Sequence, residues 1–205
     1  MELKNKEILM VLSHCDDEII CGWPIFQDKN IKKKIIIASS DLNNSNRIWC
    51  SHRKFIFNEI CKFYNIESWC LDYDSEFSFN ELQSKFLKND LISLIKKINF
   101  DYIFTHNFYG EYGHPDHIFL FKLIHKYYPN RTIISDIKYN DLKNPLQNYS
   151  KQHLINLRSK YFKNKIYNAR VNKKTYSELR DYYKEFNVWT WNNDFTQDKT
   201  SLYLV

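Results

Sequence analysis

The sequence predicts an α/β fold in a single domain, with a mostly parallel β-sheet covered by helices on both faces. Short apolar runs of strand length alternate along the chain with longer segments of helical periodicity. This order implies right-handed crossover connections, and therefore parallel strands. With 205 residues the chain also fits a single hydrophobic core, since such cores grow to roughly 150–250 residues before they divide.

The first half of the chain supplies strands and helices in turn. Residues 8–12 (ILMVL) form an apolar run of buried-strand length, and residues 34–40 repeat this arrangement. Residues 17–28 suit a short helix that connects the two strands. Residues 51–64 place their apolar side chains on one helix face, and residues 68–73 have the composition of a returning strand.

The second half continues the alternation. Residues 80–98 carry the clearest helical pattern, and residues 101–105 form the next strand. Pro115 opens a helix over 116–127, at a position where its missing N–H is harmless. The remaining predicted elements are a strand at 131–137, helical stretches near 150–163 and 173–187, and a last strand-like segment at 202–205.

Composition narrows the classes of function. A hydrophobic fraction of 43% beside 26% charged residues is typical of a globular protein. The net charge of +6 is mild, and no basic stripe or nucleic-acid motif is present, so we expect no nucleic-acid partner. No stretch approaches the roughly 20 apolar residues of a membrane span, which leaves only peripheral membrane contact. Five cysteines without CxxC spacing predict reduced thiols and a cytoplasmic protein.

Two polar clusters follow predicted strands and point to a zinc site. They are His14-Cys15-Asp16-Asp17-Glu18 and His114-Pro115-Asp116-His117. Both belong at the carboxyl end of a parallel sheet, where such sheets bind ligands. A hydrolytic zinc takes three His, Asp or Glu ligands and leaves one position open for water. His14, Asp17 and His117 suit the three ligand positions, with Asp16 and His114 beside them as an acid/base pair.

Each cluster alone has a simpler interpretation. Asp16-Asp17-Glu18 resembles the acidic first turn of a helix, which capping and the helix dipole favour. A single His-x-x-His is weak evidence for a metal, because one histidine can cap a helix while the other faces solvent. The conjunction of the clusters favours the metal site. Gly110 and Gly113, two of the three glycines, crowd the second cluster and suggest unusual backbone geometry near a ligand.

These residues carry a resemblance to a known family. Residues 11–18 resemble the His-Pro-Asp-Asp-Glu signature of the PIG-L/LmbE-like zinc deacetylases. Residues 105–107 and 110–117 look like that family's second signature. The resemblance covers roughly residues 7–125. It implies a Rossmann-like fold with a catalytic core at about 7–137, and a variable part at about 138–205 in which such enzymes choose their substrates.

The resemblance also implies a role for each residue of the two signatures. The implied reaction is the zinc-dependent hydrolysis of the N-acetyl group of an N-acetylglucosamine-type sugar or sugar conjugate. The implied metal ligands are His14, Asp17 and His117. The implied catalytic residues are Asp16 as general base, His114 as cationic acid or electrostatic stabiliser, Asp116 as the partner that keeps His114 protonated, and Tyr112 as a group that polarises the amide oxygen.

The sequence departs from the family at several positions. Cys15 replaces the usual proline, and we expect its side chain to point away from the site. Arg53 matches an arginine that would bind substrate, a role for which Arg47 is the alternative and a plain surface position the competing interpretation. His106 ends a predicted strand near the site. We expect it either to contact the metal ligands or the substrate, or to be an ordinary structural histidine.

The sequence therefore predicts a cytoplasmic, zinc-dependent N-deacetylase that acts on a small-molecule or glycan-linked N-acetylhexosamine. Ferrous iron fits the same ligands. One alternative is a zinc hydrolase of another amide or an ester. Another is a non-catalytic sugar-binding relative with the same fold. The sugar acceptor, the native metal and the oligomeric state are open at this point, because specificity lies in loops that one sequence does not define.

Overall fold

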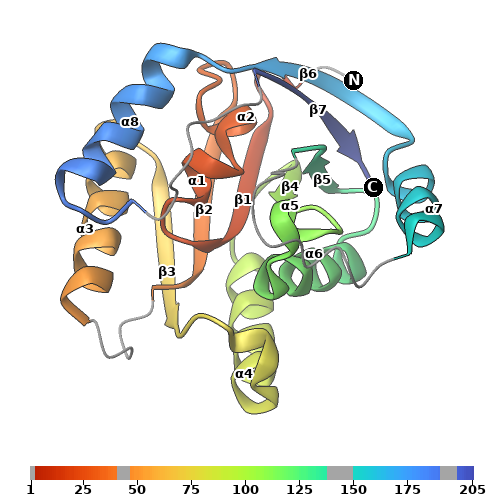
Figure 1. The fold of residues 1–205 in the computed structure, drawn as a ribbon, viewed down its shortest axis with the longest axis horizontal. Helices are drawn as coiled ribbons and strands as arrows, with labels where there is room; N and C mark the ends of the chain where they lie inside the picture. The colour runs from red at the N-terminus through yellow and green to blue at the C-terminus, as the bar shows by residue number, and fades with distance from the viewer. Residues whose placement is uncertain (1–2, 41–46, 138–149, 190–197) are drawn as a thin grey trace.

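One mixed sheet organises the chain (Figure 1). The computed structural model describes residues 3–40, 47–137, 150–189 and 198–205. In sheet order the strands are β3 (Glu67–Tyr73), β2 (Lys32–Ser39), β1 (Glu7–His14), β4 (Tyr102–Thr105), β5 (Thr132–Ser135), β7 (Lys199–Leu204) and β6 (Asn164–Arg170). Strands β1 to β5 pair in parallel, whereas β7 is antiparallel to both β5 and β6. The prediction of a mostly parallel α/β sheet is confirmed.

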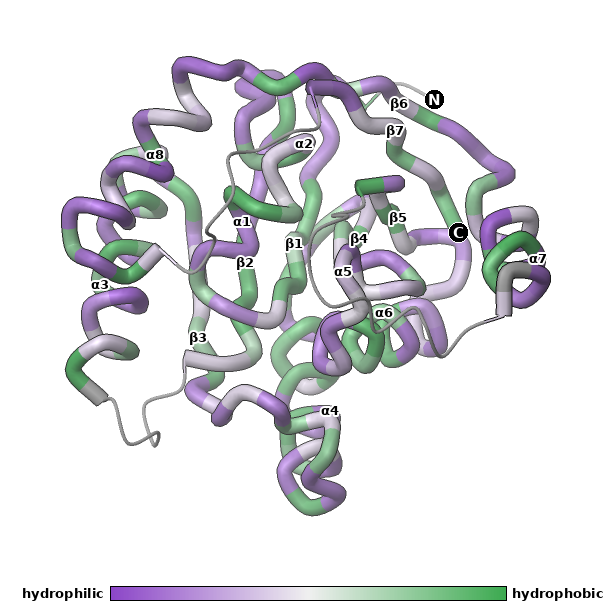
Figure 2. Tube along the Cα trace, viewed as in Figure 1, coloured by the Kyte–Doolittle hydropathy of each residue, from purple (hydrophilic) through white to green (hydrophobic). Residues whose placement is uncertain are grey.

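Helices cover both faces of this sheet. They are α1 (Asp17–Ile20), α2 (Trp23–Phe26), α3 (Arg47–Phe63), α4 (Glu81–Ile95), α5 (Gly110–Gly113), α6 (Pro115–Tyr127), α7 (Lys151–Tyr161) and α8 (Lys173–Glu185), with a 3₁₀ helix η1 (Phe77–Phe79) before α4. Hydrophobic segments run through the central strands, whereas α3 and α8 mix hydrophilic and hydrophobic residues (Figure 2).

Strand β1 is buried on both sides and separates two hydrophobic clusters. Met10 and Leu12 pack with Phe57 of α3 and Tyr183 of α8. The intervening Leu9 and Val11 face the opposite cluster, which includes residues from α4 and α6. Successive side chains of a strand point to opposite faces, so a continuous apolar run is what a strand between two helical layers requires.

Two segments differ from the sequence prediction. The helix expected over 17–28 is two short helices that meet at Gly22. A Cβ atom at Gly22 would lie 2.5 Å from Cε of Met10 and 3.0 Å from Cα of Glu18, so this turn packs against β1 too closely for a side chain. Strand β6, which the sequence did not predict, pairs along β7 as an edge strand with mostly exposed or half-buried residues. Because β6 is mostly polar, its sequence lacks the apolar run by which the other strands were predicted.

The order β3-β2-β1-β4-β5 reverses direction between β1 and β4, as in doubly wound Rossmann-like sheets. Folds of this kind bind ligands beside the carboxyl ends of the two strands at this point. His14 ends β1, and the second polar cluster follows β4. Among the described residues, no helix is both long and apolar enough to cross a membrane.

Candidate metal centre

Local backbone geometry turns the first polar cluster toward the site. His14 is the last residue of β1, and Asp16 then adopts a left-handed conformation with φ of 101° as the N-cap of α1. This reversal lets Oδ2 of Asp17 accept a hydrogen bond of 2.7 Å from the backbone N–H of His14. The side chains of His14 and Asp17 are both buried, and they lie side by side.

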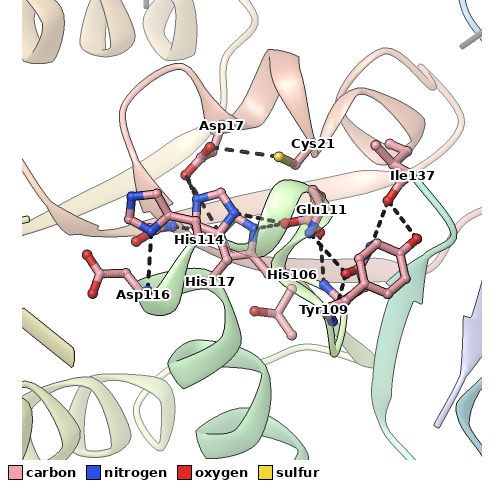
Figure 3. A network of polar contacts seen from close by, with 12 residues as sticks. Asp17, Cys21, His106, Tyr109, Glu111, His114, Asp116, His117 and Ile137 are labelled. Carbon is pink, nitrogen blue, oxygen red and sulfur yellow. Dashed lines mark hydrogen bonds and ion pairs between the residues drawn. The ribbon is translucent and has the colours of Figure 1, made fainter. Parts of the chain in front are cut away.

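The second cluster approaches from α6. Pro115 occupies the first turn of this helix, and Nδ1 of His114 caps it by accepting the backbone N–H of Asp116 at 3.2 Å. The predicted helix start at Pro115 is thus confirmed. His117 lies one turn further on, fully buried, and its Nε2 lies 3.4 Å from Oδ2 of Asp17 (Figure 3).

The three expected ligands converge on one point. Oδ2 of Asp17 lies 3.4 Å from Nδ1 of His14 and 3.4 Å from Nε2 of His117. One ligand atom from each residue lies within 4.8 Å of the others. Metal–ligand bonds of about 2.0–2.1 Å in a tetrahedral arrangement separate neighbouring donor atoms by roughly 3.3–3.4 Å. The observed separations therefore match the edge of a tetrahedral coordination shell.

The chemistry of these donors also fits a divalent cation. Nε2 of His117, the ring atom that faces Asp17, is buried and has no hydrogen-bond partner among the described residues. A buried nitrogen atom is rarely left without a partner, and a cation would supply one when this nitrogen is deprotonated. Two imidazoles and a carboxylate are a donor set that binds either zinc or ferrous iron.

Charges at the centre favour a cation. Burial alone would raise the pKa of Asp17, but the neighbouring imidazoles, His117 foremost, hold it well below its usual range. Burial alone would lower the pKa of His117, yet the carboxylates of Asp17 and Glu111 raise it to about 10. The site thus stabilises positive charge at the position where the three donors meet.

Glu111 is a buried residue beside the ligands to which the sequence analysis gave no role. Its Oε2 lies 2.8 Å from Nδ1 of His117 and 3.0 Å from Nδ1 of His106. Nε2 of His106 in turn accepts the backbone N–H of Ser13 at 3.0 Å. His106 is fully buried, so it offers no ring nitrogen to a substrate in this arrangement. The signal that could have revealed Glu111 is an acidic residue between Gly110 and Gly113.

Asp16 lies beside Arg53 of α3. The two side chains form a buried ion pair, and the guanidinium lies 5.2 Å from the centre of the Trp49 ring. Burial would lower the pKa of Arg53, but the carboxylate of Asp16 raises it. Arg53 is only 8% exposed, which excludes a plain surface position. Arg47 begins α3, and its side chain lies outside the part of the chain that the structure describes.

Glu18 joins the first cluster to the C-terminal part of the chain. Its Oε2 accepts the backbone N–H of Asp16 at 2.9 Å, and its Oε1 accepts the hydroxyl of Tyr183 of α8 at 2.7 Å. Burial raises the pKa of Glu18 to about 8. Helix α8 therefore supports the segment that carries Asp16 and Asp17.

His114, Tyr112 and Asp116 line the other side of the centre. The Tyr112 ring lies 5.6 Å from that of His114 and 5.2 Å from that of His117. Burial, reinforced by the neighbouring imidazoles, lowers the pKa of His114 to about 3. Since Nδ1 of His114 accepts a backbone N–H, the proton of the neutral ring sits on Nε2.

Asp116 makes different contacts from those expected. We predicted that its carboxylate would keep His114 protonated. It instead accepts the backbone N–H groups of Glu76 at 2.6 Å and Ser78 at 3.0 Å, and lies 3.7 Å from Nε2 of His14. Residues two apart at a helix start do not face each other, which explains the difference.

The cysteines near the site are free thiols. Cys15 packs in the hydrophobic core, and its hydrogen bond with Cys70, together with burial, raises its pKa well above the usual range. This agrees with the expectation that Cys15 points away from the ligands. Cys21 is closer, with Sγ 3.8 Å from Oδ1 of Asp17. It forms a second group of potential ligands with His106, Glu111 and His117.

Comparison with known proteins identifies the fold. The crystal structure of Dbv21, the deacetylase of the antimicrobial A40926 pseudoaglycone, superposes with a TM-score of 0.58 over 98% of this chain and 97% of that one, at 10% identity. A deacetylase–teicoplanin complex from the teicoplanin biosynthesis pathway gives 0.52 over 97% of both chains, also at 10% identity. The chain therefore has the fold of these deacetylases.

Sequence comparison gives one informative relative. The uncharacterized protein L374 of Acanthamoeba polyphaga mimivirus is 30% identical over 131 residues, or 59% of this chain. The matched region spans 57% of the length of that relative. No family profile matches the sequence.

Proposed function

We propose that this chain is a metal-dependent hydrolase that removes the N-acetyl group from an N-acetylhexosamine of the N-acetylglucosamine type. The observation that carries the proposal is the convergence of His14, Asp17 and His117 at the carboxyl ends of β1 and β4. Two structural neighbours of the same fold are described as deacetylases, and one of them was crystallised in complex with teicoplanin. Both support this reaction class.

The chain's own residues would then divide the reaction between them. His14, Asp17 and His117 would hold the ion. When bound, the ion would act as a Lewis acid on the amide oxygen and acidify the attacking water. Asp16 would accept the proton of that water, and Arg53 would hold the Asp16 carboxylate in place through their ion pair.

The opposite wall would serve the developing oxyanion, while the proton that Asp16 takes from the water would pass to the leaving amine. His114 would donate a hydrogen bond from Nε2 to the developing oxyanion, the electrostatic role that its neutral ring permits. Tyr112, beside the His114 ring, would add a second donor. Asp116 would fix the position of η1 and of His14 through its contacts with them.

The remaining features of the proposal come from the sequence. Zinc is the proposed ion, with ferrous iron as the alternative for the same donors. We propose a small-molecule or glycan-linked substrate, a deacetylase domain over residues 1–205 whose C-terminal part selects it, and a cytoplasmic location. Arg53 and Arg47 stay proposed substrate contacts, whereas His106 is better placed to support the ligands.

Release of acetate tests the proposal. The purified chain, loaded with Zn²⁺ or anaerobically with Fe²⁺, is incubated with UDP-N-acetylglucosamine and simple N-acetylglucosamine glycosides, and with O-acetylated sugars as the ester control. We expect acetate from the amides. The Asp16→Asn variant should retain its metal and lose turnover, whereas His14→Ala and Asp17→Ala should lose the metal.

Three outcomes would contradict this assignment. Acetate from esters alone would favour the alternative hydrolase. Full turnover by Asp16→Asn would remove the general-base role from this residue. Sugar binding without hydrolysis by the metal-loaded chain would favour the non-catalytic relative.

A further inference from the structure

Glu111 has an unusual backbone for a residue with a side chain. Its φ and ψ of 56° and −52° lie in a region of strained, tight turns that glycine tolerates far better. Such conformations cost roughly 1–3 kcal/mol and persist where the surroundings impose them. Gly110 and Gly113, the first and last residues of α5, also have positive φ. The strain raises the question of what the Glu111 side chain does.

The carboxylate of Glu111 is the meeting point of three N–H groups. Oε2 accepts from Nδ1 of His117 and Nδ1 of His106, and Oε1 accepts the backbone N–H of Asn107 at 2.9 Å. The side chain is 1% exposed. Asn107 and Glu111 form a second hydrogen bond, in which Oδ1 of Asn107 accepts the backbone N–H of Glu111 at 3.1 Å. The strained residue is thus held on both its backbone and its side chain.

This contact determines which nitrogen of His117 can bind a metal. An ionised carboxylate only accepts hydrogen bonds, so Nδ1 of His117 must carry the proton. Nε2, which lies 3.4 Å from Oδ2 of Asp17, is then the nitrogen that a metal can bind when the ring is neutral. Figure 3 shows Glu111 on the side of the two stacked imidazoles that faces away from His114.

His106 extends the contact to the other ligand segment. Its ring stacks on that of His117, with centres 3.6 Å apart and an interplanar angle of 19°. Nδ1 of His106 donates to Glu111, and Nε2 accepts the N–H of Ser13, the residue before His14. One continuous hydrogen-bonded path therefore joins the end of β1 to His117.

We propose that Glu111 is a positioning residue which, together with His106, fixes the tautomer of His117 and the spacing between the two ligand segments. The inference rests on the proposed metal centre. It also explains why the second group of potential ligands, which includes Cys21, need not hold an ion of its own. Its His106, Glu111 and His117 atoms already satisfy one another.

Glu111→Gln tests this with little change of shape. A glutamine amide has one acceptor oxygen and one donor nitrogen. If its oxygen faces the imidazoles, its NH₂ meets the backbone N–H of Asn107. If its nitrogen faces them, both rings must change tautomer, and Nε2 of His117 becomes protonated. Loss of such a supporting contact weakens metal binding by roughly 10–100-fold.

The measurement is the Zn²⁺ dissociation constant of the full chain, by competition with a chromophoric chelator. We expect 10–100-fold weaker binding for Glu111→Gln. The matched control, Glu185→Gln, removes one negative charge from an exposed position of α8 and should bind Zn²⁺ like the wild type. Wild-type affinity in Glu111→Gln would overturn the inference. Absence of Zn²⁺ binding in the wild type would instead refute the proposed function.

A second readout does not depend on the variant folding. In the ¹⁵N-labelled wild-type chain loaded with Zn²⁺, two-bond imidazole correlations should report His106 and His117 as Nδ1–H tautomers. A residue with a purely structural role would leave these signals unchanged on substitution. An Nε2–H tautomer for His117 in the wild type would overturn the inference, whether or not Glu111→Gln folds.

Discussion

Arg53→Met should destabilise the fold by about 3–5 kcal/mol, because it leaves the Asp16 carboxylate buried without its cation. Asp16 is 1% exposed and Arg53 8% exposed, so water does not replace the lost partner. Methionine keeps the length of the side chain and its contact with the Trp49 ring. The expected loss therefore reports the ion pair and not a cavity.

A double-mutant cycle isolates the pair. Asp16→Asn with Arg53→Met replaces both charges, and should be more stable than the sum of the two single effects by about 2–3 kcal/mol. The free energy of unfolding is measured by urea titration, followed by far-ultraviolet circular dichroism, with equal m-values as the check on the unfolded state. Single effects that add within about 0.5 kcal/mol would refute the coupling of Arg53 to Asp16.

Three further changes have definite expectations. Asp17→Ala should abolish stoichiometric metal binding, as measured by plasma emission after dialysis, and retention of one ion per chain would contradict the ligand set. Burial raises the pKa of Glu18 from 4.5 to about 8, so folding stability should fall as pH rises through this interval, by about 1.36 kcal/mol per pH unit at most. Urea titrations at several pH values should show that the stability of Glu18→Gln lacks this dependence on pH. If the stability of the wild type and that of Glu18→Gln changed in parallel with pH, the assigned pKa shift of Glu18 would be contradicted. Gly22→Ala should destabilise by about 1–3 kcal/mol in the same assay, since its Cβ meets Met10 and the backbone of Glu18, whereas unchanged stability would show that the turn can relax.

Most of the sheet could be predicted because its strands are continuous apolar runs. Residues 8–12 lie within β1 and are completely buried, as expected for a strand covered on both faces. Strand β6 lacks this signal. Its residues are mostly exposed or half-buried without a regular alternation, and its pairing with β7 depends on residues about 35 positions away in sequence. Such long-range pairing leaves no local pattern.

The convergence of His14, Asp17 and His117 could be predicted because both clusters follow neighbouring parallel strands. Their approach then follows from sheet topology. The contacts of Glu111 could not be predicted from the sequence. They depend on a strained backbone at Glu111 and on His106, which contacts Glu111 from the end of β4. Sequence adjacency also misled the assignment of Asp116, whose carboxylate contacts the start of η1 instead of the His114 ring.

Anomalous diffraction at the zinc or iron edge, on crystals of the metal-loaded chain, tests the central claim most directly. A single peak about 2.0–2.2 Å from ligand atoms of His14, Asp17 and His117 is the predicted result. A peak beside Cys21, His106 and Glu111 alone would contradict the account. A metal bound away from the carboxyl ends of β1 and β4 would contradict it too.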